Sequence, residues 1–108
     1  MANYKKTHTT LKGIRYSLLI ADTDAKRKKG LSGLDKIRYR TGMIFTYDED
    51  VQHGFTFSDV SFPLTIIFLD DKFQPIELYH TKAHQSNNVV PKNKFRHVIE
   101  IPKTNLHL

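Results

Sequence analysis

Two histidines four residues apart, His80 and His84, have the spacing in this chain that is most typical of metal chemistry. On an α-helix this spacing places both imidazoles on one face, as many zinc sites require. The surrounding residues instead favour a strand end that runs into a loop, where the two rings do not converge. The chain also has no cysteine, which excludes a thiolate metal site and a disulfide framework. We therefore expect no metal site.

The acidic side chains offer little acid–base chemistry. They cluster at 48–50 and 70–71, in segments that we interpret as solvated turns. Paired carboxylates act as acid and base only where burial separates their pKa values. No serine stands in a Gly-x-Ser-x-Gly elbow, and no glycine-rich loop suits a phosphate. We therefore name no catalytic residue and no cofactor, and we expect binding rather than catalysis.

Basic side chains are concentrated in the first third of the chain. Residues 1–40 carry 11 Lys and Arg against 3 acidic residues, a net charge of +8, whereas 41–80 carry −6 and 81–108 carry +4. A basic surface suits an acidic protein partner or nucleic acid, and Tyr39 and Tyr47 could add base stacking. Solvated faces that serve only solubility are the alternative. The expected partner contacts are Lys26, Arg27, Lys28, Lys29, Arg38 and Arg40.

The elements that must position these side chains are mostly strands. Apolar runs and period-two alternation predict strands at 14–22, 42–47, 53–59, 64–69, 73–79 and 97–101. One short helix is expected over residues 23–30, with Asp22 or Thr23 as its cap and Gly30 as its terminator. Residues 48–50 read as an acidic turn and 81–96 as one long loop.

This pattern predicts a mainly β, compact domain, either a β-sandwich or barrel-like, with one short helix. The whole chain, 1–108, is expected to be one domain with its core at about 14–102 and tails at 1–12 and 103–108. The N-terminus has no apolar stretch typical of a signal peptide, and no run reaches the roughly 18 apolar residues of a membrane helix. We expect a cytoplasmic protein, or one in a virion, without a membrane partner.

Several motifs resemble those of the domain of unknown function 192 family. They are Gly30-Leu31, the Gly42–Phe45 element, the Phe62–Asp70 element with its Pro-Leu pair, and the Val98–Pro102 strand. Their order and spacing match over about residues 14–102. The resemblance implies a small β-sandwich or barrel-like fold with one short helix and implies no established enzymatic activity. The chain is similar to a divergent, C-terminally short member.

The same resemblance indicates where a polar site would lie. Before the Pro-Leu pair the family usually has Trp-Met-x-Asn-Thr, and Asp59 stands here in place of the Asn. After the pair the family usually has Asp, and this chain has Thr65. Asp59, Thr65 and the nearby His53 are therefore the candidate ligand-binding residues.

Three functions are compatible with these observations. We expect first a non-enzymatic binding or structural accessory module in a larger protein assembly, such as a phage virion. The first alternative is a nucleic-acid-binding module that uses the basic N-terminal third. The second alternative is a small-ligand-binding or hydrolytic protein with a degenerate polar pocket at Asp59, His53 and Thr65.

Overall fold

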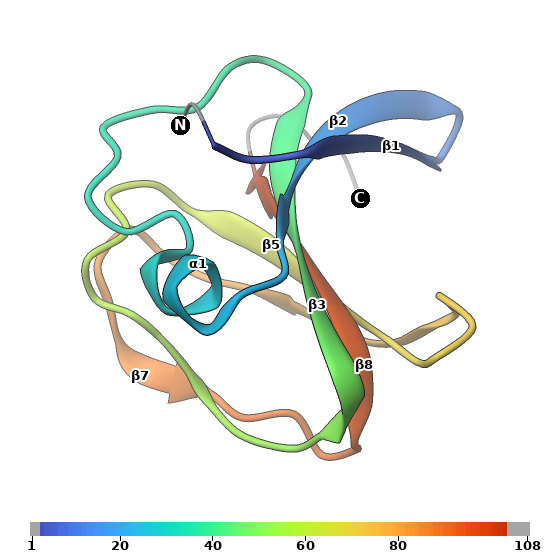
Figure 1. The fold of residues 1–108 in the computed structure, drawn as a ribbon. Coiled ribbons are helices and arrows are strands. Elements are labelled where there is room, and N and C mark those ends of the chain that lie inside the picture. The colour runs from blue at the N-terminus through green and yellow to red at the C-terminus, as the bar shows by residue number, and fades with distance from the viewer. Residues whose placement is uncertain (1–2, 104–108) are drawn as a thin grey trace.

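The computed structural model describes residues 3–103, which form eight strands and one short helix (Figure 1). The elements follow one another in the order β1 (Lys6–Leu11), β2 (Ile14–Ala21), α1 (Asp24–Lys29), β3 (Thr41–Val51), β4 (Phe55–Phe57), β5 (Leu64–Leu69), β6 (Pro75–His80), β7 (Gln85–Val89) and β8 (Phe95–Pro102). The mainly β fold with one short helix is thereby confirmed.

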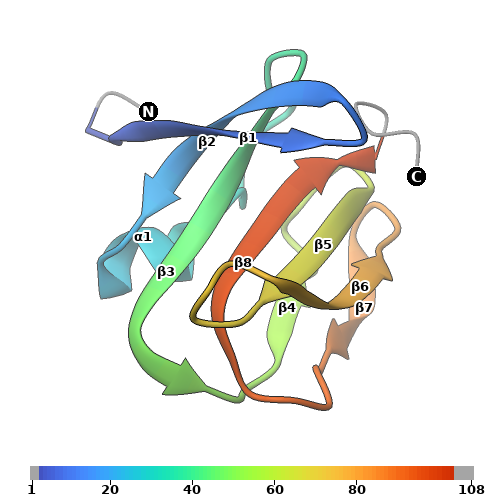
Figure 2. The same ribbon diagram turned by 90° about the vertical axis from the view of Figure 1, so that its right-hand side faces the viewer.

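Two sheets make up the architecture. The larger has six strands in the order β1-β2-β3-β8-β5-β6, and the smaller pairs β4 with β7 (Figure 2). The large sheet ends at β1 on one side and at β6 on the other, so it is open and does not close into a barrel. Figure 1 shows α1 and β7 together on one side of β3 and β8. One face of the large sheet is therefore covered by the helix and the small sheet.

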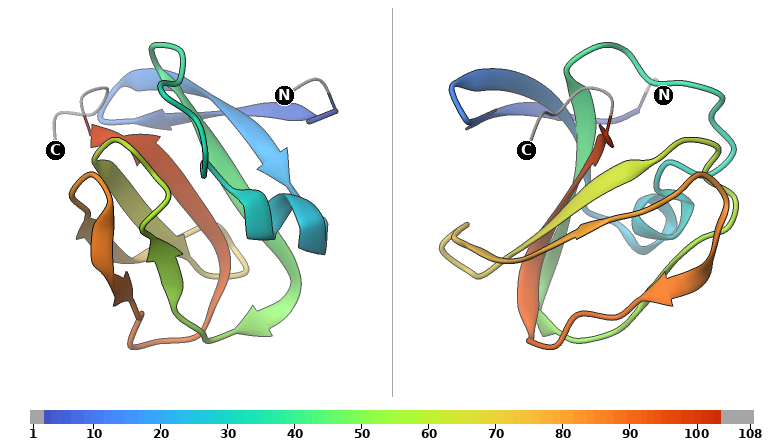
Figure 3. Two further views of the ribbon diagram at one scale, coloured as in Figure 1. Left: turned by 90° about the vertical axis from the view of Figure 1, so that its left-hand side faces the viewer. Right: turned by 180° about the vertical axis from the view of Figure 1, so that it is seen from behind.

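The helix belongs to a β2–α1–β3 unit, because β2 and β3 pair in parallel and need a crossover between them. Thr23 caps α1, since its Oγ1 accepts a hydrogen bond from the backbone N–H of Lys26 at 3.2 Å. Gly30 ends α1 with a positive φ of 50°, and its N–H donates to the carbonyl of Lys26. Figure 3 shows the long connection that then leads from α1 to β3. The predicted helix and both of its ends are confirmed.

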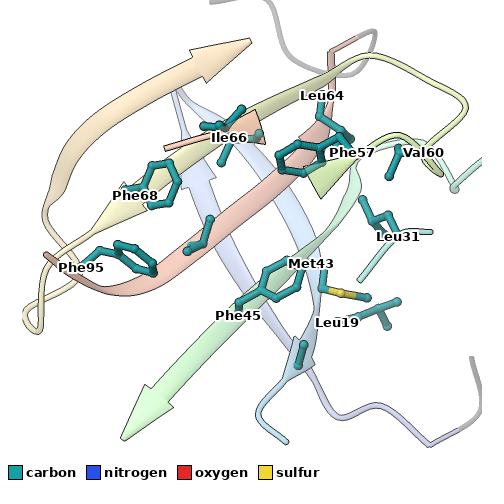
Figure 4. Close-up of a cluster of buried hydrophobic side chains, with 13 residues drawn as sticks. Leu19, Leu31, Met43, Phe45, Phe57, Val60, Leu64, Ile66, Phe68 and Phe95 are labelled. Carbon is teal, nitrogen blue, oxygen red and sulfur yellow. The ribbon is translucent and has the colours of Figure 1, made fainter. Parts of the chain in front are cut away.

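The central strands bury side chains on both faces of the large sheet. All six residues of β5 are buried, as a continuous apolar run predicts. Leu64, Ile66 and Phe68 belong to the main core, whose side chains are drawn in Figure 4. Ile67 and Leu69 pack in a second cluster with residues of β2, β3 and β8. The neighbouring strands β3 and β8 lie so close that a Cβ at Gly42 would clash with the backbone carbonyl of Glu100.

Three segments differ from the sequence-based expectation. Residues 6–11, expected within an N-terminal tail, form β1, which pairs with β2 across a turn where Lys12 and Gly13 both have positive φ. The prediction of an acidic turn at 48–50 is wrong, because β3 continues to Val51. Within this strand Oδ1 of Asp50 lies 3.0 Å from Nε of Arg96 in β8. The long loop at 81–96 contains β7, whose backbone pairs with β4. In each segment the structure is determined by pairing with a neighbouring strand, and a polar sequence gives no pattern from which that pairing could be predicted. Of the expected C-terminal tail, residues 104–108 lie outside the described residues.

Candidate functional site

A cavity of about 300 Å³ lies beneath α1, between the helix and the main core, and is called the α1 cavity below. Its lining comes from α1 and the segment that follows it, from β3, from β4 and the segments on either side of β4, and from one residue of β8. The lining residues are Asp24, Arg27, Lys28, Lys29, Gly30, Leu31, Ser32, Phe45, Tyr47, His53, Gly54, Phe55, Thr56, Phe57, Val60 and Glu100. The volume is at the lower end of the range for small-molecule sites in proteins.

Glu100 lies among apolar side chains at the floor of this cavity. On the flanking strands of the sheet its register partners are Met43 and Ile66, both fully buried. Only 3% of Glu100 is exposed, and burial raises the pKa of its carboxyl group to about 8. At neutral pH the side chain is therefore mostly an uncharged acid that can donate one hydrogen bond and accept others.

The carboxyl group of Glu100 is directed at the cavity. Among residues 3–103 it has no side-chain hydrogen-bond partner. In the same range, every side-chain oxygen that is fully shielded from solvent does have a partner, so the Glu100 oxygens are not fully shielded. Its oxygens must therefore contact the solvent-accessible space of the cavity that Glu100 lines. The arrangement thus combines a carboxylic acid with a cavity that aromatic and polar side chains line.

Aromatic rings form one wall of the cavity. Phe55 of β4 lies at the centre, with ring centroids 6.3 Å from Phe45, 5.7 Å from Phe95 and 4.8 Å from His53. The ring of His53 also meets Tyr47 edge-on at 5.7 Å. These edge-on and tilted ring contacts restrict the ring orientations and form an aromatic wall.

Arg27 joins the helix to the sheet at the side of the cavity. It donates to the carbonyl oxygen of Thr46 at 2.8 Å and to the Oδ1 atom of Asp24 at 2.6 Å. Its guanidinium lies 4.8 Å from the ring centroid of Tyr47. Burial raises the pKa of Tyr47, and the positive charge of Arg27 partly offsets that rise. These contacts place the helix over the cavity.

The other basic residues expected to contact a partner fall into two groups. Lys28 and Lys29 are exposed at the mouth of the α1 cavity, whereas Lys26 faces Tyr4 and Asp22. Arg38 and Arg40 lie on the exposed loop before β3, where Arg40 stacks on Tyr39. That loop lines a second cavity of about 490 Å³ beside β1 and β2. The six cations therefore do not share one patch.

The three candidate ligand-binding residues also do not come together. His53 is exposed and lines the α1 cavity. Asp59 is exposed in the turn after β4, where its backbone carbonyl accepts a hydrogen bond from Gly33. Thr65 is fully buried and faces the opposite side of the sheet, where its Oγ1 lies 2.9 Å from Nδ1 of His80. Only His53 of the three lines this site.

The two histidines with zinc-like spacing have separate partners. His80 pairs with Thr65 across β5 and β6, while Nδ1 of His84 lies 2.9 Å from the carbonyl oxygen of Ser58. Within residues 3–103 no three His, Cys, Asp or Glu side chains are grouped so as to hold a metal ion. No helix in that range is both long and apolar enough to span a bilayer.

Glu100 is the residue of this site that the sequence-based reasoning did not select. It stands inside the apolar run Val98–Pro102, where a charged side chain interrupts a strand that is otherwise suited to burial. A lone carboxylate within such a run is the indication that could have found it, because burial of an unpaired charge is costly and is kept for a reason.

The fold and the cavity define a small mainly β domain with an open sheet and one buried acid beneath its helix. This chain belongs to the DUF192 family, described as "Uncharacterized ACR", whose family model matches residues 6–107. Among curated proteins none matches the chain.

Two solved structures are similar in fold. One is a protein of unknown function from Novosphingobium aromaticivorans DSM 12444, with a TM-score of 0.77, 20% identity, and coverage of 92% of this chain and 73% of that chain. The other is described as a "putative transcription regulator" from Sinorhizobium meliloti 1021, with a TM-score of 0.77, 18% identity, and coverage of 94% and 84%. At these identities the likeness shows the fold alone.

Proposed function

We propose that the protein is a small-molecule-binding module that holds its ligand in the α1 cavity. The observation that carries the proposal is the carboxyl group of Glu100, buried in an apolar site and facing the cavity without a protein partner among residues 3–103. A ligand that hydrogen-bonds to this acid would supply the missing partner, and the rings of Phe45 and Phe55 would cover its apolar body.

A titration with acetophenone, followed by amide NMR shifts, tests this proposal. Acetophenone is a flat apolar molecule whose carbonyl oxygen can accept a hydrogen bond from the protonated Glu100. We expect the shifts to be confined to residues around 28–32, 45–47, 54–57 and 99–101. Residues 7–11 and 73–75, which line a cavity on the opposite face of the sheet, serve as the internal control. Shifts spread over both faces, or none up to the solubility limit, would contradict the proposal.

Two substitutions separate the role of Glu100 from a general hydrophobic effect. Glu100→Gln keeps a hydrogen-bond donor and should retain most of the acetophenone affinity. Glu100→Leu removes the polar group from the floor and should weaken binding several-fold, although it makes the cavity more apolar. Thermal unfolding of both variants verifies that the fold is intact. Stronger binding by the leucine variant would show that the acid does not orient the ligand.

A protein-contact module in a larger assembly is the second candidate. Edge strand β6 exposes Ile76 and Leu78, and the preceding turn exposes Phe73. Exposed apolar side chains along a sheet edge are typical of surfaces that meet another chain. Co-purification of the native protein, with the Leu78→Lys variant as the comparison, tests this candidate. Loss of a partner in that variant would support it, whereas an unchanged set of partners, or none, would count against it.

Two further expectations stay predictions. The first is that the protein is part of a phage virion or is found in the cytoplasm. Nucleic-acid binding through the basic residues would be recognised by an affinity that falls steeply with salt. Arg38 and Arg40, beside the exposed Tyr39, are the residues to substitute in that assay.

A further inference from the structure

The charges around the α1 cavity are divided unevenly between its floor and its mouth. Glu100, at the floor, is held uncharged at neutral pH by its burial. At the mouth, α1 contributes the cations Arg27, Lys28 and Lys29 and one acid, Asp24. Arg27 pairs with Asp24 at 2.6 Å, so these two charges largely offset each other. The remaining charge at the mouth is therefore positive.

The side chains of the two lysines differ in how many protein contacts they already make. The ammonium group of Lys29 donates to the carbonyl oxygen of Ser32 at 3.2 Å, which holds it beside the cavity. Lys28 is exposed and has no side-chain hydrogen bond or ion pair among residues 3–103. Both belong to the six-residue helix that Arg27 fixes over the cavity, so their positions relative to the floor are constrained.

We propose that the α1 cavity takes a compact organic carboxylate, with its anionic group at Lys28 and Lys29 and its apolar body against the aromatic wall. At its far end the ligand would present a hydrogen-bond acceptor to Glu100. This inference rests on the proposed function, and it adds the chemical class of the ligand and its orientation.

Charge explains why an anion is preferred to a cation. A cationic ligand would be repelled by the lysines at the mouth, and it would find no ionised acid at the floor. The other titratable groups that line the cavity are Tyr47 and His53, which carry no negative charge at neutral pH. Asp24 is already paired with Arg27. A carboxylate is therefore attracted by the positive charge at the mouth and is not repelled by an ionised acid at the floor.

Three probes of similar shape test the inference: para-acetylbenzoate, para-acetylbenzamide and para-(aminomethyl)acetophenone, which are anionic, neutral and cationic at neutral pH. Their affinities for the full chain are measured by NMR titration at low salt. We expect the carboxylate to bind about three- to tenfold more tightly than the amide, and the amine to bind most weakly. The advantage of the carboxylate should shrink as salt is added.

Matched variants assign the effect to the mouth. The double substitution Lys28→Gln and Lys29→Gln should reduce the carboxylate to the affinity of the amide, whereas Lys72→Gln on the remote β5–β6 turn should leave it unchanged. Equal affinities of carboxylate and amide in the wild type, or tightest binding by the amine, would overturn the inference and leave the small-molecule proposal standing. Failure of all three probes, and of acetophenone, to bind at the cavity would overturn both.

Discussion

The guanidinium group of Arg27 lies 4.8 Å from the ring centroid of Tyr47, while the same side chain donates to the backbone carbonyl of Thr46. One residue of a six-residue helix is thereby joined twice to β3. A helix this short is not stable by itself, so tertiary contacts must hold it. The contacts of Arg27 therefore hold α1 in place over the α1 cavity.

Replacing Arg27 by alanine should destabilise the protein by about 1–2 kcal/mol, because a charged hydrogen bond and a cation–π contact are both lost. Arg27→Lys should recover only part of the loss, since an ammonium group lacks the planar donors of a guanidinium. Denaturant unfolding measures both changes. The matched control is Lys28→Ala, an exposed residue of the same helix with no side-chain hydrogen bond or ion pair among residues 3–103, which should stay within about 0.5 kcal/mol of the wild type.

Glu100 should make the protein less stable as pH rises. Its pKa in the folded state is about 8, above the ordinary value of 4.5, so between these values the folded chain keeps a proton that the unfolded chain has released. Stability then falls by about 1.4 kcal/mol per pH unit. Over the whole interval the loss amounts to a few kcal/mol.

The Glu100→Gln variant has no such proton. Its free energy of unfolding should resemble that of the wild type near pH 5 and should exceed it near pH 8 by a few kcal/mol. The difference between the two proteins isolates this residue from all other titrating groups. Parallel stability curves across this range would mean that the acid is not buried as described.

Glu77 should have the opposite pH dependence. Partial burial alone would raise its pKa, but hydrogen bonds from Tyr79, Lys92 and Asn93 outweigh that effect and lower the pKa to about 2. The carboxylate therefore stabilises the fold above about pH 4.5, and this contribution is lost as pH falls towards 2. Glu77→Gln should cost about 1–2 kcal/mol at neutral pH, because the ionised acceptor of several hydrogen bonds is lost.

Chemical unfolding at several pH values measures the effect of Glu77. The deficit of the Glu77→Gln variant should close between about pH 4.5 and pH 2, where the wild-type carboxylate becomes protonated. If the stability deficit of the variant persisted unchanged at acid pH, the negative charge of Glu77 would not be what holds the 91–94 segment to β6.

The parts of the fold that could be predicted from the sequence are those with local chemical causes. Thr23 and Gly30 delimit α1 because capping and positive φ are properties of single residues. The run Leu64–Leu69 indicates a strand buried on both faces. By contrast, Gln85–Val89 is polar, and it becomes β7 only because β4 lies beside it. Strands formed by pairing in this way carry little pattern of their own.

The candidate site was less predictable than the fold. The family resemblance indicates Asp59 and Thr65 as ligand-binding positions, but the alternation of side chains along β5 places Thr65 on the opposite face of the sheet. Glu100 comes from the last strand, and its place beneath α1 depends on the register of β8 with both β3 and β5. No sequence pattern specifies that register by itself.

The ionisation of Glu100, followed by carboxyl carbon NMR with and without acetophenone, tests the central claim most directly. In the free protein the titration midpoint should lie near pH 8. Acetophenone should raise it further, because the ligand displaces water from the cavity and accepts a hydrogen bond only from the protonated acid. A midpoint near the ordinary value of 4.5, or one that acetophenone does not move, would contradict the claim that this acid forms the floor of a ligand site.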